Sequence, residues 1–452
     1  MVLAQFAAAD GVCSIYAMLP TIYREFPSQS GAVSWIVTTF FLVAATVAAI
    51  VGRLADVLGR RTVAIALLCI AALGAFLGSV AHSVAPLIAA SVLIGVTMVL
   101  TPVLIGLARE DLAPEKLSFG IAAISAAGCA GAGLVFLLTG FIVDNFGRAG
   151  GYTSMGLLSL LAAGLIAIGV PRSPRSLTRL SDIDFVRGIL FGPAVGGMIL
   201  AVELGSMNGW TNGVAPTLLL GSLLLAIYWW RNQLRQARPL IDLRLLSHGK
   251  ALGGLIAMAL LGLALQGGQV FSLLLQQSDG TSAGFGLSAT RAGMMMALIN
   301  GTAIFSSPIA GWLAKRFGVR PIAILGAGIM VVGWVFCIFA FGSLGTLVAG
   351  AIVTVTGVNM ATTPLYLLIV ESTPPELTSG AAGLANTLYN LGFAVGSQIV
   401  LVILMGGGNG AANANDYLTA FIWLALASGA VLCPMIVGSR LGRIRDTARG
   451  VA

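Results

Sequence analysis

The sequence predicts an all-α membrane protein that crosses a bilayer fourteen times. Of its 452 residues, 58% are hydrophobic and only 9% are charged, whereas a soluble globular chain carries roughly 25% charged residues. Because so few charges cannot cover a water-facing surface, the apolar excess must face lipid or other helices. The apolar residues also gather in runs of about 20, the length that a helix needs to cross the hydrocarbon core.

Each apolar run of this length is interpreted as one transmembrane helix. The first run has no basic region before it and no cleavage pattern after it, so it is interpreted as a span and not as a signal peptide. The predicted spans are 2–22, 32–52, 62–82, 86–107, 118–143, 150–170, 186–205, 214–230, 252–277, 290–314, 320–341, 346–369, 380–405 and 417–438.

Lys and Arg are distributed unequally between the alternating loops. If the N-terminus lies in the cytoplasm, all but three of the 24 Lys and Arg residues fall on the cytoplasmic side. The exceptions are Arg24, Arg148 and Arg291. Cytoplasmic loops attract basic residues, and one misplaced span would reverse every later loop. The split predicts a multi-pass protein of the cell (inner) membrane, with both termini in the cytoplasm.

Two cytoplasmic turns recur in the second half of the chain. The turn 52–61 shares Gly, Leu, Ala, Gly and Arg with 311–320 in the same order, and 107–118 matches 368–379 at nearly the same offset. Such repeats are typical of secondary transporters, with the substrate path between the two halves. The predicted domains are an N-terminal six-helix bundle (1–170), a linker with two inserted transmembrane helices (171–250), a C-terminal six-helix bundle (251–438) and a basic cytoplasmic tail (439–452).

The turn 52–61 resembles the GxLaDxxGRR motif of the major facilitator superfamily. Further segments resemble the fourteen-span drug:proton antiporter branch of that family. One is the pair of Asp10 and 17–20 in the first span, and the others are 35–38, 239–245, 286–288 and 292–293. The resemblance implies the major facilitator fold, with two six-helix bundles plus two inserted central helices. It also implies a secondary active transporter that exports a small amphipathic drug or metabolite in exchange for protons, by alternating access.

Three positions depart from the pattern of this branch. Ser91 stands where the branch carries an Arg in the fourth span, and 135–140 lacks the proline of the GPxxGG sequence in the fifth. Tyr389 and Asn390 replace an Arg-Gln pair in the thirteenth span. These departures leave the coupling mechanism and the direction of export open, but they do not affect the predicted fold.

Asp10 is the sharpest candidate for a coupling residue. It lies near the middle of the first span, where an ionised carboxylate is costly and ionisable residues are usually functional. We interpret Asp10 as the proton-coupling site. The alternative is a carboxylate that hydrogen-bonds to a neighbouring helix for packing alone. Glu203, the other acidic residue within a span, lies close to a span end and is interpreted as interfacial.

The turn 52–61 carries the candidate conformational latch. Gly52 and Gly59 permit close approach and tight turning, and Asp56, Arg60 and Arg61 supply charges. We expect these charges to hold the two halves together in one conformational state. A solvated basic loop without such a role is the alternative.

Polar residues at helical spacing in apolar spans are candidates for the substrate cavity. Their side chains would line a route through the bilayer, or they would tie helices together through hydrogen bonds, and the sequence leaves both interpretations open. The candidates are Ser14, Ser91, Gln266, Gln269, Asn300, Asn359, Asn386, Tyr389 and Asn390.

Other classes of function lack their expected residues. The five cysteines form no CxxC pair, the two histidines are far apart, and no GxxxxGK[ST] loop or Ser/His/Asp set occurs. We therefore expect no enzyme, no metal, no cofactor and no nucleic-acid partner. The expected partners are a small-molecule substrate, protons and the lipid bilayer, and the sequence leaves periplasmic efflux components open. An uncoupled facilitator or metabolite exporter of the same fold, or a non-transporting membrane receptor, is the alternative function.

Overall fold

The computed structural model describes residues 1–171, 190–208, 213–235, 249–277, 283–339, 341–371, 378–405 and 412–435. Within these residues every regular element is a helix, which confirms the all-α prediction. Twelve helical segments among them are long and apolar enough to cross a membrane. The predicted tail 439–452 and the segment 239–245 lie outside the described residues, as does the side chain of Glu203.

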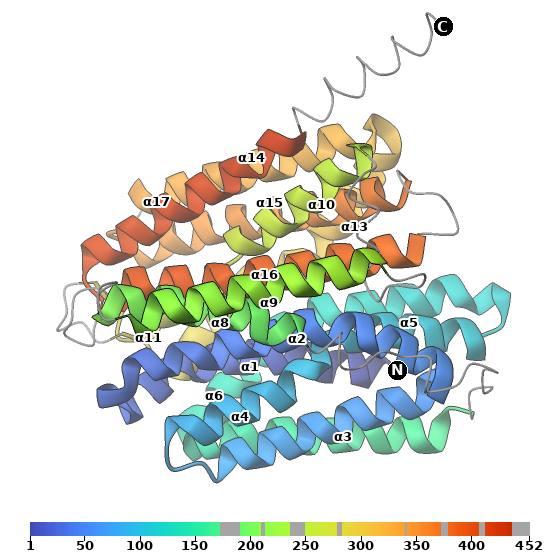
Figure 1. Cartoon of the computed structure of the whole chain (residues 1–452), viewed down its shortest axis with the longest axis horizontal. Helices are drawn as coiled ribbons and strands as arrows, with labels where there is room; N and C mark the ends of the chain where they lie inside the picture. The colour runs from blue at the N-terminus through green and yellow to red at the C-terminus, as the bar shows by residue number, and fades with distance from the viewer. Residues whose placement is uncertain are drawn as a thin grey trace, which may run out of the picture.

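The first half of the chain forms a group of helices that Figure 1 shows in blue to cyan at the lower side of the molecule. A 3₁₀ turn, η1 (Pro27–Gln29), separates the first two helices. The helices of this half are α1 (Val2–Glu25), α2 (Ser30–Leu58), α3 (Arg60–Ser79), α4 (Val84–Ile94), the 3₁₀ helix η2 (Gly95–Val99), α5 (Leu100–Asp111) and α6 (Pro114–Gly169).

The second half lies above the first in the same view, coloured from yellow-green to red. Two green helices, α8 (Phe191–Asn208) and α9 (Val214–Arg235), lie between the halves in sequence, and α8 contacts both α2 and α16. The helices of the second half are α10 (Gly249–Ala264), α11 (Gly267–Gln276), α12 (Ala289–Gly301), α13 (Ala303–Phe317), α14 (Val319–Phe339), α15 (Leu344–Glu371), α16 (Thr378–Met405) and α17 (Ala414–Ala430).

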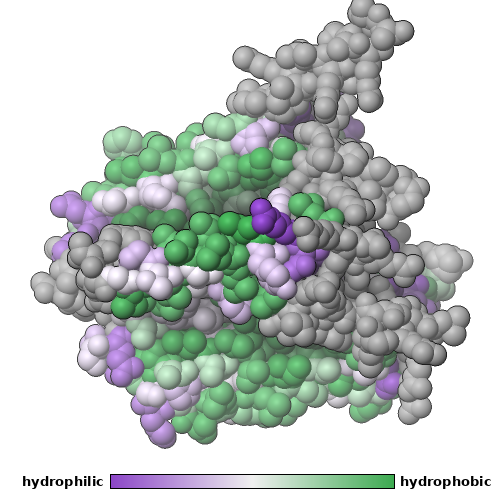
Figure 2. All heavy atoms as spheres, in the orientation of Figure 1, coloured by the Kyte–Doolittle hydropathy of each residue, from purple (hydrophilic) through white to green (hydrophobic). Residues whose placement is uncertain are grey.

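Two places account for the difference between twelve segments and fourteen predicted spans. The predicted spans 118–143 and 150–170 both lie in α6, which turns at Gly147 with a left-handed φ of 65°. The predicted span 186–205 corresponds to α8, in which the fully described apolar stretch is Phe191–Ala201, because residues 172–189 and several side chains after Ala201 lie outside the described part of the chain. The number fourteen therefore stays a prediction. Figure 2 shows that the visible surface is largely hydrophobic over the middle of the helices, with hydrophilic residues gathered toward their ends.

The two halves are built alike at the repeated turn. Gly59 joins α2 to α3 with a φ of 88°, and Gly318 joins α13 to α14 with a φ of 93°. Positive φ combined with the extended ψ of these two residues is adopted almost only by glycine, because a residue with a Cβ there costs about 1–3 kcal/mol. Two residues after each glycine an arginine donates to the end of a distant helix: Arg61 to the Ala167 carbonyl, and Arg320 to the Met435 carbonyl. The sequence repeat is thus also a repeat of backbone geometry and contacts.

Arg148 fixes the opposite end of the first half. Only 8% of the residue is exposed, and it follows the turn at Gly147 directly. Its guanidinium donates to Glu25 Oε2 at 2.7 Å, to the Gly78 carbonyl at 2.7 Å and to the Ala81 carbonyl at 2.8 Å. One buried cation therefore joins the end of α1, the end of α3 and the second part of α6. This structural role explains one of the three basic residues predicted on the non-cytoplasmic side.

We expect Arg148→Gln to destabilise the protein by about 2 kcal/mol, because Glu25 loses its counter-charge and two carbonyls lose charged donors. The measurement is thermal unfolding of the purified protein in detergent. Lys116→Gln removes the same charge from an exposed position on α6 and serves as the control. Equal melting temperatures for the two variants would contradict the role assigned to Arg148.

Candidate functional site

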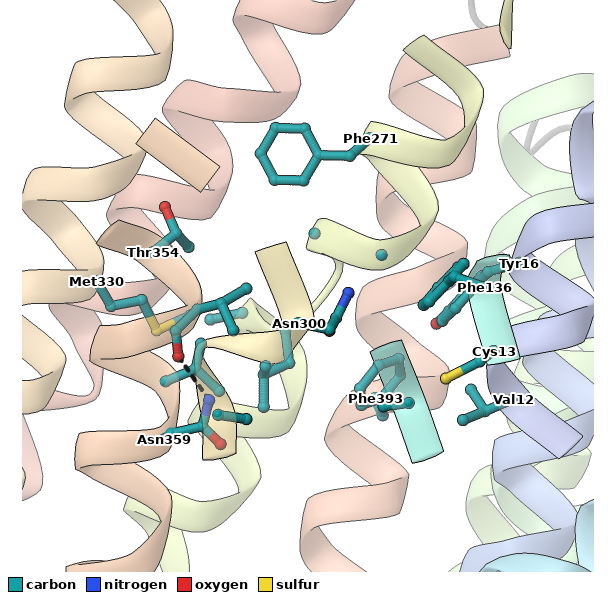
Figure 3. Close-up of a pocket in the computed structure, with 18 of the residues that line it drawn as sticks. Val12, Cys13, Tyr16, Phe136, Phe271, Asn300, Met330, Thr354, Asn359 and Phe393 are labelled. Atoms are coloured by element: carbon teal, nitrogen blue, oxygen red, sulfur yellow. Dashed lines mark hydrogen bonds between the residues drawn. The ribbon is translucent and has the colours of Figure 1, made fainter. Parts of the chain in front are cut away.

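A cavity of about 330 Å³ lies between the two halves of the protein. Helices α1, α2 and α6 and the 3₁₀ helix η2 line it from the first half, and helices from α10 to α16 line it from the second. Among the described lining residues none is charged, and the walls are mainly aromatic and aliphatic. Figure 3 shows labelled side chains from both halves that face this space. The aromatic lining residues are Tyr16, Phe41, Phe136, Phe271, Trp334, Tyr389 and Phe393.

Three apolar segments depart from continuous α-helical hydrogen bonding where they border the cavity. The segment Leu252–Gln276 is interrupted between α10 and α11, and Ala289–Phe317 is interrupted at Thr302 between α12 and α13. In the segment Val84–Asp111 the 3₁₀ helix η2 separates α4 from α5, and its residue Met98 lines the cavity. Irregular backbone at membrane depth is tolerated where it is buried in protein or lines an aqueous cavity. The three interruptions therefore all lie where the backbone is buried in protein beside this cavity.

The cavity includes some of the polar residues predicted to line it. Asn300, Asn359 and Tyr389 are lining residues. Asn359 also accepts a hydrogen bond from the Ser307 hydroxyl at 3.2 Å and donates to the Val355 carbonyl at 2.8 Å, so its orientation is fixed by α13 and by its own helix. The function of these three residues stays a prediction.

Other predicted cavity residues lie in the helix contacts around the cavity and are not among its lining residues. Ser91 is fully buried and donates to the Leu87 carbonyl of its own helix at 3.0 Å. Gln266 donates to the Phe393 carbonyl at 3.2 Å and thereby ties the α10–α11 junction to α16. The remaining three are Gln269, which is fully buried, Asn386, which accepts from the Tyr366 hydroxyl at 3.3 Å, and Asn390, which donates to the Asn386 carbonyl at 2.9 Å.

Asp10 lies behind the cavity wall with 6% of its surface exposed. The Ser14 hydroxyl donates to Asp10 Oδ1 at 2.5 Å and shares a second hydrogen bond of 2.6 Å with the Thr139 hydroxyl on α6. Within the part of the chain that the structure describes, no Lys or Arg forms an ion pair with Asp10. Cys13, three residues after Asp10, lines the cavity. The proposed proton site is therefore one helical turn from the cavity, and Ser14 belongs to its hydrogen-bond network.

The predicted latch residues contact their own half of the protein. Arg60 forms an ion pair of 3.1 Å with Glu110 and donates to the Gly106 carbonyl at 3.0 Å, both on α5. Arg61 donates to α6, as described above. The contacts of Gly52 and of the Asp56 side chain lie outside the part of the chain that the structure describes. A latch between the halves at this turn stays a prediction.

The halves are joined at the opposite end of the bundle. We call this the Arg-poor end; it holds the α1–α2 connection, the turn at Gly147 and the start of α12, and its predicted loops carry only three basic residues. Here the Thr38 hydroxyl of α2 donates to Gln398 Oε1 of α16 at 2.8 Å and lies 3.3 Å from the Ser397 hydroxyl. The Ser272 hydroxyl of α11 donates to the Tyr16 carbonyl of α1 at 2.5 Å.

A carboxylate on α6 completes this contact between the halves. Asp144 accepts hydrogen bonds from the Ala289 amide at 3.0 Å, from the Thr290 amide at 2.8 Å and from the Thr290 hydroxyl at 2.5 Å. One half therefore caps the N-terminus of a helix of the other, where the helix dipole favours a negative charge. The two helices pack closely behind this cap, because a Cβ at Gly140 would collide with the Ala289 carbonyl.

Some residues of the cavity were not predicted from the sequence. Tyr16, Phe136 and Trp334 stand in apolar runs, where an aromatic ring that faces a cavity looks the same as one that faces lipid. The sequence does indicate the break between α10 and α11. Gln266 is followed by Gly267 and Gly268, and adjacent glycines weaken a helix.

Comparison with known proteins places the chain among membrane transporters. The family model described as Major Facilitator Superfamily matches residues 1–397. The methyl viologen resistance protein SmvA of Salmonella typhimurium is 25% identical over 411 residues, which cover 89% of this chain and 81% of that protein. The uridine/deoxyuridine transporter of Lactococcus lactis is 26% identical over 460 residues and covers 98% of this chain and 89% of its own.

A solved structure shares the fold. The crystal structure of the peptide transporter POT in complex with sulfate superposes with a TM-score of 0.69 and 17% sequence identity, over 98% of this chain and 93% of that chain. At this identity the likeness concerns the arrangement of helices and does not extend to the solute.

We expect Asp144→Ala to open the Arg-poor end. Losing three hydrogen bonds of about 1 kcal/mol each would shift the population toward a state open at that end by about tenfold or more. The measurement is the labelling rate of Cys13 by an impermeant maleimide added at that side, in a chain whose other cysteines are replaced by serine.

Asp416→Ala is the control for this measurement. Asp416 caps α17 by accepting from the Asn413 amide at 2.8 Å, so it caps a helix within its own half. Faster labelling in both variants, or in neither, would contradict the role of Asp144 in holding the halves together at the Arg-poor end.

Proposed function

The chain belongs to the major facilitator superfamily, and we propose that it exports a small amphipathic drug or metabolite in exchange for protons. The observation that carries the proposal is the cavity between the halves, since both halves contribute its walls and a movement of one half against the other would change its access. The resemblance to the cephamycin export protein CmcT of Amycolatopsis lactamdurans, which is 26% identical over 449 residues, supports export as the direction.

The chemistry of the cavity supports an amphipathic solute. Aromatic and aliphatic side chains supply most of the lining, while Asn300, Thr354 and Asn359 supply separate polar groups. Ligand sites of this kind bind through apolar area and gain orientation from a few polar contacts. A strongly charged solute would enter without a counter-charge among the described lining residues.

Alternating access is supported by the contacts at the Arg-poor end. Polar contacts between the halves there are few, and each hydrogen bond contributes about 1 kcal/mol net. Such contacts can break and re-form during transport. The halves also pack through buried apolar residues, among them the stacked rings of Phe41 on α2 and Phe393 on α16, and this packing must separate as well. In this proposal the structure represents a state closed at the Arg-poor end, and the charges at 52–61 would stabilise the state closed at the other end.

Proton coupling is assigned to Asp10. The carboxylate is buried, and Ser14 is its hydrogen-bond partner. Gaining a proton would remove a charge from an apolar environment and alter the bonds through Ser14 to Thr139 on α6. Because Asp10 lies one helical turn from Cys13, which lines the cavity, protonation can favour one orientation of the halves over the other.

We also propose the topology that this function requires. Fourteen spans, arranged as six, two and six, place both termini in the cytoplasm of a cell whose inner membrane holds the protein. The inserted pair is formed by α8 and α9, and the contacts of α8 with α2 and α16 place it beside the junction of the halves.

An uncoupled facilitator or metabolite exporter is the second candidate. Ser91 stands where the related branch has an arginine, and its hydroxyl bonds only to its own helix in the described contacts. A proton site without a basic partner at membrane depth would favour transport down a gradient. The resemblance to a uridine/deoxyuridine transporter fits such a function equally well.

Asp10→Asn separates these two candidates. We expect the wild-type protein in proteoliposomes to accumulate acridone against a gradient when a pH gradient is imposed, and Asp10→Asn to lose this accumulation while solute exchange at equal pH continues. Asp111→Asn changes an exposed carboxyl on α5 and should behave as wild type. If Asp10→Asn still accumulates the solute against its gradient, Asp10 is not the proton-coupling residue.

A further inference from the structure

The interruption between α10 and α11 exposes the start of a helix to the cavity. Helix α11 has ten residues and its N-cap, Gln266, makes no side-chain cap hydrogen bond. The first amides of a helix have no acceptor within that helix, and the helix end carries a partial positive charge. Gly267 and Gly268 line the cavity, and neither has a side chain that would cover these amides.

Two further hydrogen-bond donors flank this helix start without an acceptor. Tyr16 is 5% exposed and Trp334 is 1% exposed, and both line the cavity. The Tyr16 hydroxyl and Trp334 Nε1 have no hydrogen-bond partner among the described residues. Leaving a buried donor unpaired costs about 1–3 kcal/mol, and most buried polar groups in proteins are paired. Both residues line the cavity, so a ligand bound there can supply the acceptor that these two donors lack.

The glycines place the two rings against the helix start. A Cβ at Gly267 would lie 3.3 Å from Trp334 Cη2, and a Cβ at Gly268 would lie 3.1 Å from Tyr16 Cδ2. The indole is held by Phe271, whose ring stacks on it with centroids 5.6 Å apart. The indole and the phenol therefore pack by their ring carbons against the start of α11, so that residues of both halves of the protein meet there.

The donors define the chemistry of the solute group that fits between them. All three kinds of donor require an oxygen or nitrogen acceptor, and no Lys or Arg among the described lining residues would balance a full negative charge. Nearby Phe41, Phe136 and Phe393 offer flat apolar contact, and Figure 3 shows Phe136 and Phe393 next to Tyr16. An uncharged aromatic solute with a carbonyl group meets these requirements.

We propose that the start of α11, together with Tyr16 and Trp334, is a carbonyl-binding subsite of the transport cavity for uncharged aromatic solutes. This assignment rests on the proposed transport function, because it names the class of solute carried. An aromatic cation without an acceptor leaves the donors unpaired and meets the positive end of the helix dipole, so the subsite selects against it.

The test compares two probes that differ only at the acceptor. Acridone has a ring carbonyl, and 9,10-dihydroacridine has a methylene group in its place. Tritiated probes are bound at equilibrium to the purified full-length protein in lipid nanodiscs, without any gradient. Tyr16→Phe and Trp334→Phe each remove one donor and keep an aromatic ring.

Matched control variants are present in the chain. The Tyr152 hydroxyl and Trp229 Nε1 are also buried without a partner among the described residues, but neither residue lines the cavity. Tyr152→Phe and Trp229→Phe therefore make the same chemical change away from the subsite.

We expect wild-type protein and both controls to bind acridone more tightly than 9,10-dihydroacridine. Tyr16→Phe and Trp334→Phe should each reduce this preference about fivefold, the effect of one hydrogen bond, mainly by weakening acridone. Because the preference is a ratio within one preparation, it is insensitive to the fraction of protein that is folded.

No preference in the wild type, or an unchanged preference in Tyr16→Phe and Trp334→Phe, would overturn the subsite. The binding measurement contains no proton gradient, so failure of proton coupling would leave its result intact. Conversely, proton-coupled solute flux together with an unchanged preference for acridone in the two variants would contradict the subsite and leave the proposed transport function standing.

Discussion

The structure depends on one constraint, which is that a backbone polar group in the hydrocarbon region must find its partner inside the protein. Continuous helices meet this requirement within each segment and form most of the bundle. Departures from regular helix are consequently informative: α10 ends before α11 begins, α12 ends before α13 begins, and η2 interrupts the fourth predicted span. Each of these places supplies residues to the same cavity. The constraint therefore locates the site before any side chain is considered.

The division into two similar halves follows from contacts that are repeated within each half. The positive φ at Gly59 and at Gly318, and the arginine two residues later, fasten a turn to the end of a distant helix in the same half. Between the halves the described polar contacts gather at the Arg-poor end, where Asp144 caps α12. Strong fastening within halves and modest hydrogen bonding between them are the mechanical conditions for rocking about a central cavity.

The sequence predicts the parts of this arrangement that depend on composition and local pattern. Apolar runs predict the helices, the basic residues predict the orientation, and the match of 52–61 with 311–320 predicts the repeat. Positions such as Trp334 and Arg148 could not be assigned in this way. A ring in an apolar run fits lipid and cavity equally well, and the role of Arg148 depends on Gly78 and Ala81, which only tertiary structure brings near it. Of the predicted polar residues, Asn300 lines the cavity and Ser91 does not.

The central claim is that the cavity changes access by separation of the halves at the Arg-poor end. The Thr38 and Ser397 hydroxyl oxygens lie 3.3 Å apart across that junction, so Thr38→Cys with Ser397→Cys, in a chain whose native cysteines are replaced, should form a disulfide that locks it. The decisive measurement is solute flux by this variant in proteoliposomes, oxidised and then reduced. We expect no flux after oxidation and full recovery after reduction. Normal flux through the oxidised, fully cross-linked protein would contradict the claim.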